Sequence, residues 1–413
     1  MNKRLKLIAG IFWITTINCY AQIKEFDPLL DSKVTVIPAP SQEEWNSNYM
    51  WYPGQLAAFY QQQSAKISKE RCVNVGYPGK FFAKNNRAYF KREIKLHKEN
   101  NLRWEGPSDI ILYVNGIKQS TTNKQITLPA GKSSLLFEVI TNDSLPCIIL
   151  KGDGMENPNE WQVSMDKNYW SIPESASMYN KPATRPDAPQ NIIAQIKPQE
   201  ILPMRNAKTI GTDGVQIGKN GYALIDFFHL EIGTLTFQAK GKGTVTVRVG
   251  ETPEEALERD DKKLEQYPLP PIKLSETGSV ISIPERALRY ASLECDEGAE
   301  ITSLKFDASM WPVEYQMQFE TDDEYINNLF KMSSATLHTS MHRFYLDGVK
   351  RDFLPWSMDA LVSTLGGDYL FGDQQVSKNG ISIALMPLNP KLSDIGIPDY
   401  PLHALFGLKQ NYL

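Results

Sequence analysis

Residues 347–359 hold the densest group of reactive side chains in the sequence. Three aspartates, an arginine and a tryptophan lie within this stretch: Asp347, Arg351, Asp352, Trp356 and Asp359. Gly348 and Pro355 restrict the backbone around them, so the stretch is predicted to be a loop. An arginine can orient a carboxylate or a ligand rich in hydroxyl groups, and an indole ring offers a flat apolar face.

These side chains supply the functional groups that hydrolysis of a glycoside requires. Hydrolysis of a glycosidic bond needs one carboxyl group to protonate the leaving oxygen, and further polar groups to hold the sugar hydroxyls. A tryptophan ring suits the C–H side of a sugar ring. The alternative interpretation is a surface loop whose aspartates cap the helix that follows it. The residues alone leave both interpretations open.

Helices are predicted on either side of this loop. The first begins at 321–324, where the sequence TDDE has the form of a capping box. Its inward face is predicted from residues at helical spacing: Ile326, Leu329, Phe330, Ser333, Leu337 and Met341. The second helix begins with Pro355, ends at Gly366 and Gly367, and directs four apolar residues inward: Met358, Leu361, Val362 and Leu365. A third helical pattern begins near Tyr400.

The chain before these helices has the short, alternating strands that are typical of antiparallel β-sandwiches. Ile110, Leu112 and Val114 alternate before the turn signal Asn115-Gly116, and residues 135–139 alternate in the same way. The first sandwich is therefore predicted over 22–180.

A second sandwich is predicted beyond a proline-rich linker at 181–203. Alternation returns at 235–239 and 245–249, and this sandwich is predicted over 204–311. The charged, proline-rich stretch 251–271 is unsuited to a core strand and should be a surface excursion. The helical region then occupies 312–413.

Composition and charge exclude several classes of protein. The 413 residues carry 44 basic and 48 acidic side chains, a net charge of −4, without a long basic run. Nucleic acid is therefore not an expected partner, and the ordinary globular composition excludes a disordered or collagen-like chain. A chain of this length forms roughly two to four domains.

The first 21 residues are predicted to be a secretory signal peptide. Lys3, Arg4 and Lys6 precede an apolar core at 7–17, and Ala21 suits cleavage before Gln22. The protein is then secreted across the inner membrane, to the periplasm or beyond. A lipoprotein interpretation of Cys19 is weaker, because Asn18 stands where a small residue is expected. No later segment approaches 18 apolar residues, so no transmembrane anchor is predicted.

No cofactor and no metal are predicted. Cys72, Cys147 and Cys295 are widely spaced and are interpreted as small buried hydrophobes, with one disulfide at most. His338 and His342 lie four residues apart and could bind a metal, but a third ligand is not evident. The alternatives are an ordinary helix surface, or a contact between His342 and a sugar. The oxygen-rich stretch 153–160 lacks the spacing of an EF-hand loop and is interpreted as a solvated turn.

The loop at 347–359 resembles the signature loop of the inverting α-L-rhamnosidases of glycoside hydrolase family 78. The shared pattern is Asp347-Gly348-x-Lys350-Arg351-Asp352-x-x-x-Trp356-x-x-Asp359, after the aromatic pair Phe344-Tyr345. The resemblance extends upstream to 248–251, 254–256 and 289–290, and it covers about 221–413. Phe353 and Met358 stand where members of the family usually have Arg and Gly.

This resemblance implies a function and a fold. Asp352 would be the general acid, with Asp347, Arg351, Trp356 and Asp359 lining a pocket for rhamnose. The carboxylates of Asp347 and Asp359 would favour a protonated Asp352, and the charge of Arg351 would oppose this effect. Two antiparallel, jelly-roll-like β-sandwiches would be followed by the beginning of an (α/α)6 barrel.

The expected function is removal of terminal α-L-rhamnose from rhamnose-containing oligo- or polysaccharides, with inversion. In this family the general base is a glutamate further along the barrel, so a truncated chain with little or no hydrolytic activity is expected. A non-catalytic carbohydrate-binding protein is the alternative, and Phe353 and Met358 leave a third possibility, a fold adapted to another sugar. The oligomeric state is not predicted.

Overall fold

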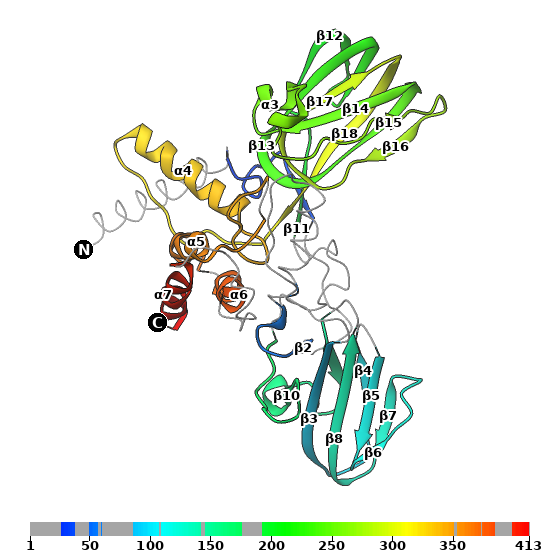
Figure 1. Cartoon of the computed structure of the whole chain (residues 1–413), viewed down its shortest axis with the longest axis vertical. Helices are drawn as coiled ribbons and strands as arrows, with labels where there is room; N and C mark the ends of the chain where they lie inside the picture. Colours follow the sequence, from blue (N-terminus) through cyan, green and yellow to red (C-terminus); the bar gives the residue numbers. More distant parts are fainter. Residues whose placement is uncertain are drawn as a thin grey trace, which may run out of the picture.

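A computed structural model of the chain describes residues 26–37, 49–56, 59, 86–106, 109–141, 145–175, 192–350, 353–372, 374–384 and 399–412. These residues form two antiparallel β-sandwiches at opposite ends of the molecule, with a group of helices beside the junction between them (Figure 1). None of the helices in these ranges combines the length and the apolar character that crossing a bilayer requires.

The first sandwich consists of a five-stranded and a four-stranded sheet. The five-stranded sheet has the order β10 (Gln162–Ser164), β3 (Asn86–Leu96), β8 (Gly131–Thr141), β5 (Asp109–Val114) and β6 (Ile117–Lys118). The second sheet has the order β2 (Met50–Trp51), β9 (Cys147–Lys151), β4 (Asn100–Glu105) and β7 (Gln125–Leu128). The neighbouring strands pair antiparallel, as the sequence predicts.

The alternating pattern of the sequence accounts for the core of this sandwich. Leu112 on β5 and Phe137 on β8 face each other in register and are fully buried. The ring of Phe137 lies 5.4 Å from that of Trp104 and 5.9 Å from that of Trp161. Asn115 adopts a φ of 51° and the following glycine a φ of 78°, the left-handed conformations that a two-residue hairpin turn requires.

The second sandwich is built around one very long strand. Its order is β1 (Thr35–Ile37), β11 (Ile192–Ile196), β18 (Gly298–Met310), β13 (Gly214–Lys242), β17 (Arg286–Cys295), β14 (Thr244–Gly250) and β15 (Ile272–Lys273). Two further strands pair with β13: β12 (Glu200–Ile210) and β16 (Ser279–Ser282). Ile301 on β18 is in register with Val215 and also with Ala239, so the two ends of β13 flank the same strand.

A bend in the middle of β13 makes this arrangement possible. The register with β17 is interrupted between Asp226 and Glu231, where Phe228 adopts a φ of 69°. The Asp226 carboxylate accepts the Phe228 N–H at 2.6 Å and also binds Arg289 through two hydrogen bonds of 3.1 Å. The bend is therefore stabilised by the hydrogen bonds of Asp226 to Phe228 and Arg289, and the residue with positive φ is a phenylalanine rather than a glycine.

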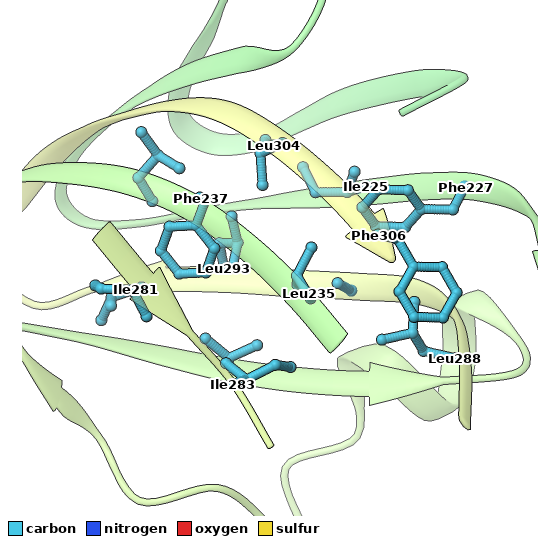
Figure 2. Packing of buried hydrophobic residues seen from close by; sticks show 14 of the residues in the cluster. Ile225, Phe227, Leu235, Phe237, Ile281, Ile283, Leu288, Leu293, Leu304 and Phe306 are labelled. Carbon is cyan, nitrogen blue, oxygen red and sulfur yellow. The ribbon is translucent and has the colours of Figure 1, made fainter. Parts of the chain in front are cut away.

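The core of the second sandwich lies between the two halves of this bent strand. In Figure 2, Phe237 of β13 lies beside Leu293 of β17, Phe227 of β13 lies beside Phe306 of β18, and Leu235 lies between these two pairs. The rings of Phe227 and Phe306 are 5.6 Å apart. These side chains are almost completely buried, so a continuous apolar layer holds the two halves of β13 together.

The structure places strands inside the expected linker. Residues 192–196 form β11, because Ile192, Ala194 and Ile196 alternate inward and pair with β18. The last residues of the predicted linker belong to β12, where Pro203 pairs with Ala223. Residues 35–37, assigned by the sequence to the first sandwich, form β1 and pair with β11. Strands of the second sandwich thus stand on both sides of the first sandwich in the sequence.

The stretch 251–271 lies outside the strands, as expected. It contains the short helix α3 (Pro253–Leu257) and the single turn η3 (Asp261–Lys263). Thr252 caps α3 by accepting the Glu255 N–H at 3.3 Å, and the buried Ala256 packs against β14.

Four helices are described after the second sandwich: α4 (Glu324–Thr339), α5 (Ser357–Leu370), α6 (Gln374–Ala384) and α7 (Tyr400–Tyr412). The N-cap of α4 is Asp323, whose carboxylate accepts the N–H groups of Tyr325 and Ile326, so the cap predicted at Thr321 is wrong by two residues. Helix α5 begins after Pro355 and continues through both glycines that were predicted to end it. The (α/α)6 barrel stays a prediction.

The predicted inward faces of α4 and α5 are wrong in part. Ile326 and Leu329 on α4, and Met358, Val362 and Leu365 on α5, have exposed side chains. The buried side of α4 carries Ser334, His338 and Thr339, and that of α5 carries Ser357, Ala360, Thr364 and Gly367. Small and polar residues face inward because the helices pack closely there and make specific hydrogen bonds, which hydrophobic spacing cannot reveal.

One of these hydrogen-bonded groups is a buried ion pair. Asp27 and His338 are both completely buried, and the Asp27 Oδ2 lies 2.6 Å from the His338 Nδ1. Tyr315 donates its hydroxyl to the same carboxylate oxygen at 2.6 Å, and the His338 Nε2 is 2.8 Å from the carbonyl oxygen of Trp311. The pair therefore ties the N-terminal segment to α4 and to the residue that follows β18.

Glu231, at the bend of β13, adds a second buried carboxyl to this group. It accepts the Thr339 hydroxyl at 3.0 Å. Burial raises the pKa of Glu231 to about 8, against the opposing charge of His338. Burial alone would lower the pKa of His338, but the charge and hydrogen bond of Asp27, together with the Trp311 carbonyl and Glu231, raise it to about 9. Burial also disfavours the charged Asp27, yet His338 and the Tyr315 hydroxyl hold its pKa below the ordinary value.

We expect the stability of the fold to fall as the pH rises. Folded His338 keeps its proton up to about pH 9, whereas the unfolded chain releases it near 6.5. Folded Glu231 keeps its proton up to about pH 8, whereas the unfolded chain releases it near 4.5. In both windows the unfolded state binds fewer protons, so the free energy of unfolding decreases by up to about 1.4 kcal/mol per pH unit for each group.

Denaturant unfolding at pH 5–9 measures this slope. Glu231→Gln should make it shallower below pH 8, and replacement of the exposed His97 by Gln should leave it unchanged. A slope that Glu231→Gln does not alter would contradict the assignment to this carboxyl.

Candidate functional site

The candidate site is the loop between α4 and α5. The structure describes residues 347–350 and 353–359 of this loop, whereas Arg351 and Asp352 lie outside the described residues. Asp347, Trp356 and Asp359 are each half-buried, so their side chains are held by the protein and still reach solvent.

Asp347 closes the base of the loop. Its backbone N–H donates to the carbonyl oxygen of Leu354 at 3.1 Å, and its Oδ1 accepts the Leu354 N–H at 3.1 Å. Asp347 does not cap the following helix, which was the alternative interpretation of the aspartates. The N-cap residue of α5 is Trp356, and no side chain makes a capping hydrogen bond there. Asp347 instead fixes the two ends of the loop against each other.

Trp356 and Asp359 both contact Tyr400, a residue that the sequence does not predict to be part of the site. Tyr400, the first residue of α7, lies with its ring 6.0 Å from that of Trp356 at an interplanar angle of 90°. Its hydroxyl donates to the Asp359 Oδ2 at 3.3 Å, and its carbonyl oxygen accepts the Ser357 hydroxyl at 2.7 Å. In the sequence Tyr400 is only the start of a helical pattern, and no motif marks it as part of a site.

The electrostatics of Tyr400 show that several carboxylates gather around it. Burial, followed by the charge and hydrogen bond of Asp359 and then by the charges of Asp399 and Asp347, raises the pKa of the Tyr400 hydroxyl. Asp347 and Asp359 therefore act on one place, although twelve positions separate them in the sequence. The half-buried Trp356 indole, the Tyr400 phenol and the Asp359 carboxylate supply the kinds of group that stack on a sugar ring and accept its hydroxyl protons.

Phe353 has an unusual backbone conformation at this site. Its φ is 57°, in the left-handed region that β-carbon-bearing residues rarely adopt, and its side chain is only 6% exposed. The ring belongs to a buried cluster that contains Met341, Phe344 and Tyr345. Burial of the ring offsets the conformational cost, which is of order 1–3 kcal/mol. An arginine, the residue usual here in the family that the loop resembles, would not suit this apolar position.

Lys350 connects the loop to the second sandwich. Its Nζ lies 3.2 Å from Glu251, 3.3 Å from Glu255 and 3.2 Å from Glu265, all on the excursion that follows β14. The candidate site is thus attached to the sandwich as well as to the helices.

The metal site considered at His338 and His342 is not formed. Both ring nitrogens of His338 are engaged, by Asp27 and by the Trp311 carbonyl, so neither can bind a metal. Within the described part of the chain no group of three or more His, Cys, Asp or Glu side chains is arranged so that it could hold a metal ion. At 153–160 the Glu156 carboxylate accepts the N–H groups of Gly152 and Met155, which makes this stretch a hydrogen-bonded turn.

Two of the three cysteines have the expected environment. Cys147 and Cys295 are buried and are not in a disulfide. Burial raises the pKa of Cys295 to about 12, so this thiol stays protonated. Cys72 lies outside the described residues.

Comparison with known proteins connects this fold to rhamnosidases. Residues 88–292 match the family model described as alpha-rhamnosidase-like, bacteroidetes, N-terminal, which confirms the resemblance that the sequence shows. The matched residues cover most of the first sandwich and much of the second, and they end before the loop at 347–359. No curated protein sequence matches this chain.

Several solved rhamnosidases are similar in structure at low sequence identity. A rhamnosidase from Klebsiella oxytoca with rhamnose bound is 16% identical, with a TM-score of 0.44, over 52% of this chain and 51% of that one. A rhamnosidase of family 78 from Bacillus sp. GL1 is 13% identical, with a TM-score of 0.40, over 92% of this chain and 45% of that one. The chain spans about half the length of these proteins.

We expect a methyl group at Gly367 to disturb the site from the side of α5. A Cβ there would overlap the hydroxyl of Tyr345, which lies just before the loop, so Gly367→Ala must displace either α5 or Tyr345. Overpacking of this kind costs about 1–3 kcal/mol. Gly380→Ala on α6 is the matched control, because its Cβ would meet Ala360 and Phe344 at ordinary distances of 3.8 and 3.9 Å.

Denaturant unfolding of both variants measures the difference. Gly380→Ala should be neutral or stabilising by up to about 1 kcal/mol, since alanine is the better helix former. Equal stability of the two variants would contradict the close packing of Tyr345 on α5.

Proposed function

We propose that this chain, whose residues 88–292 belong to the alpha-rhamnosidase-like N-terminal family, is an α-L-rhamnosidase that binds terminal α-L-rhamnosyl residues at the loop 347–359. The family match carries this proposal. The geometry of the loop supports it, because Tyr400 contacts both the Trp356 ring and the Asp359 carboxylate there. A rhamnose-containing oligo- or polysaccharide is the proposed substrate.

The proposed reaction is hydrolysis with inversion. The bond between C1 and the glycosidic oxygen breaks, its electron pair stays on the oxygen, and that oxygen takes the proton of the Asp352 carboxyl group. Water attacks C1 from the opposite face and gives its proton to a second carboxylate. We assign the acid to Asp352 and the holding of sugar hydroxyls to Asp347, Arg351 and Asp359. The sequence assigns the second carboxylate to no residue of this chain.

Trp356 is proposed to stack on the sugar. Its ring is fixed on one side by the edge-to-face contact with Tyr400, so little side-chain freedom is lost when a sugar ring packs on the half-buried indole. The buried Phe353 replaces the arginine usual in the family, and the pocket is therefore proposed to have one charged group fewer.

Rhamnose binding and hydrolysis test this proposal together. The purified protein should bind L-rhamnose in a calorimetric titration, and Trp356→Ala should weaken binding about tenfold, roughly 1.4 kcal/mol. Trp170→Ala, which removes a half-buried indole of the first sandwich, serves as the control. A wild-type protein that does not bind rhamnose would overturn the assignment of the substrate.

The role of Asp352 is tested by Asp352→Asn. Where the wild type hydrolyses a rhamnoside with a poor leaving group, the turnover by Asp352→Asn should be lower by about 10²–10⁴, because protonation of the leaving oxygen is lost, while rhamnose affinity changes little. Undiminished turnover would show that another group is the acid. Rhamnose binding by a wild-type protein that has no turnover would favour the non-catalytic carbohydrate-binding protein.

A further inference from the structure

Lys350 lies within salt-bridge distance of three carboxylates that belong to another domain. Its Nζ is 3.2 Å from the Oε2 of Glu251, 3.3 Å from that of Glu255 and 3.2 Å from that of Glu265. The Lys350 side chain is 19% exposed and that of Glu255 is 17% exposed, so part of this group is shielded from water. Ninety-five positions separate Lys350 from Glu255 in the sequence.

Glu255 is held in place by contacts that do not involve Lys350. Glu255 lies on α3, which is capped by Thr252 and tied to β17 by the Ser292 hydroxyl, which donates to the Ala256 carbonyl at 2.7 Å. The Glu255 Oε2 also accepts the Glu251 N–H at 2.9 Å. A side chain at Gly250 would clash with the Ala256 backbone, so the turn between β14 and α3 is closely packed. Glu255 is thus a fixed acceptor on the second sandwich, whereas the side chains of Glu251 and Glu265 are 48% and 45% exposed.

The balance of charge makes Lys350 necessary to this arrangement. Three carboxylates around one ammonium group leave a local excess of negative charge, and loss of the lysine would leave the repulsion among them without this counter-charge. Burial alone would lower the pKa of Lys350, but Glu255, Glu265 and Glu251 raise it above its ordinary value. The lysine therefore stays charged throughout the neutral range.

The position of Lys350 in the loop gives this contact a consequence for the site. The hydrogen bonds between Asp347 and Leu354 close the base of the loop, and Lys350 stands between these two residues. The loop is consequently fixed at its base by its own backbone and at its middle by the sandwich. Helix α5, which carries Asp359, begins three residues beyond Leu354.

We propose that Lys350 is a positioning residue: by binding the carboxylates of Glu251, Glu255 and Glu265, it holds Asp347 and the described residues beside it in the conformation that binds the sugar. This inference rests on the proposed function for the identity of the sugar. The salt bridges themselves connect the second sandwich to the loop three residues after Asp347.

Three variants test this inference in the full chain. Lys350→Met removes the charge and keeps most of the side-chain volume, and Lys350→Arg restores a cation. Lys263→Met is the matched control, because Lys263 pairs with Glu258 on the same excursion at 3.2 Å and does not reach the loop. Hydrogen exchange of the amides at 347–356 is measured without sugar, and L-rhamnose affinity is measured by calorimetry.

Lys350→Met should raise the exchange rate of the Leu354 amide at least tenfold and weaken rhamnose binding about tenfold. Lys350→Arg should recover most of the affinity, and Lys263→Met should change neither quantity. Glu251→Gln combined with Glu265→Gln should give a smaller effect in the same direction, because Glu255 still holds the lysine. This double variant keeps the inference testable if Lys350→Met does not fold.

The two readouts separate this inference from the proposed function. Unchanged loop exchange and unchanged rhamnose affinity in Lys350→Met would overturn the positioning role while the function stands. Faster loop exchange in Lys350→Met, in a protein whose wild type does not bind rhamnose, would support the positioning role and overturn the function. Loss of affinity that Lys350→Arg does not restore would contradict a role based on charge.

Discussion

The buried ion pair of Asp27 and His338 is the constraint on which the arrangement of the domains depends. A charge removed from water is stable only with a well-placed partner, so a carboxylate and an imidazolium that are both fully buried fix the segments that carry them. Here those segments are the N-terminal residues, helix α4 and the end of β18. Next to them, Glu231 joins the bend of β13 to the same helix through Thr339. The helices, and with them the loop 347–359, are placed by this polar group.

An apolar cluster surrounds the ion pair and makes its burial possible. Trp51 and Cys147 from the first sandwich, Ile232 from the second, and Trp311 and Tyr345 near the helices pack into one cluster. Exclusion of water by these side chains strengthens the electrostatic attraction inside. The junction of the domains is therefore a continuous core that contains the Asp27–His338 ion pair.

The sequence predicts local features of this structure well and its long-range partners poorly. Alternation at 110–114 and the Asn115-Gly116 turn lead directly to β5 and its hairpin, because both are determined by neighbouring residues. The buried side of α4 was missed because it depends on His338, whose partner Asp27 is 311 positions away. In the site, residue types pointed to the loop, but Tyr400 and the three glutamates around Lys350 became visible only when distant segments were brought together.

The pairing of β1 with β11 affects the order in which the domains fold. These strands stand on either side of the first sandwich in the sequence, and β11 pairs in turn with β18. Contacts that are close in sequence form faster than contacts between distant segments, and the entropy of closing a loop grows only slowly with its length. The first sandwich, whose strands are contiguous, is thus expected to form early and to shorten the effective loop between β1 and β11. The early folding of the first sandwich would then speed up the slower pairing of β1 with β11, the strands that precede and follow it in the sequence.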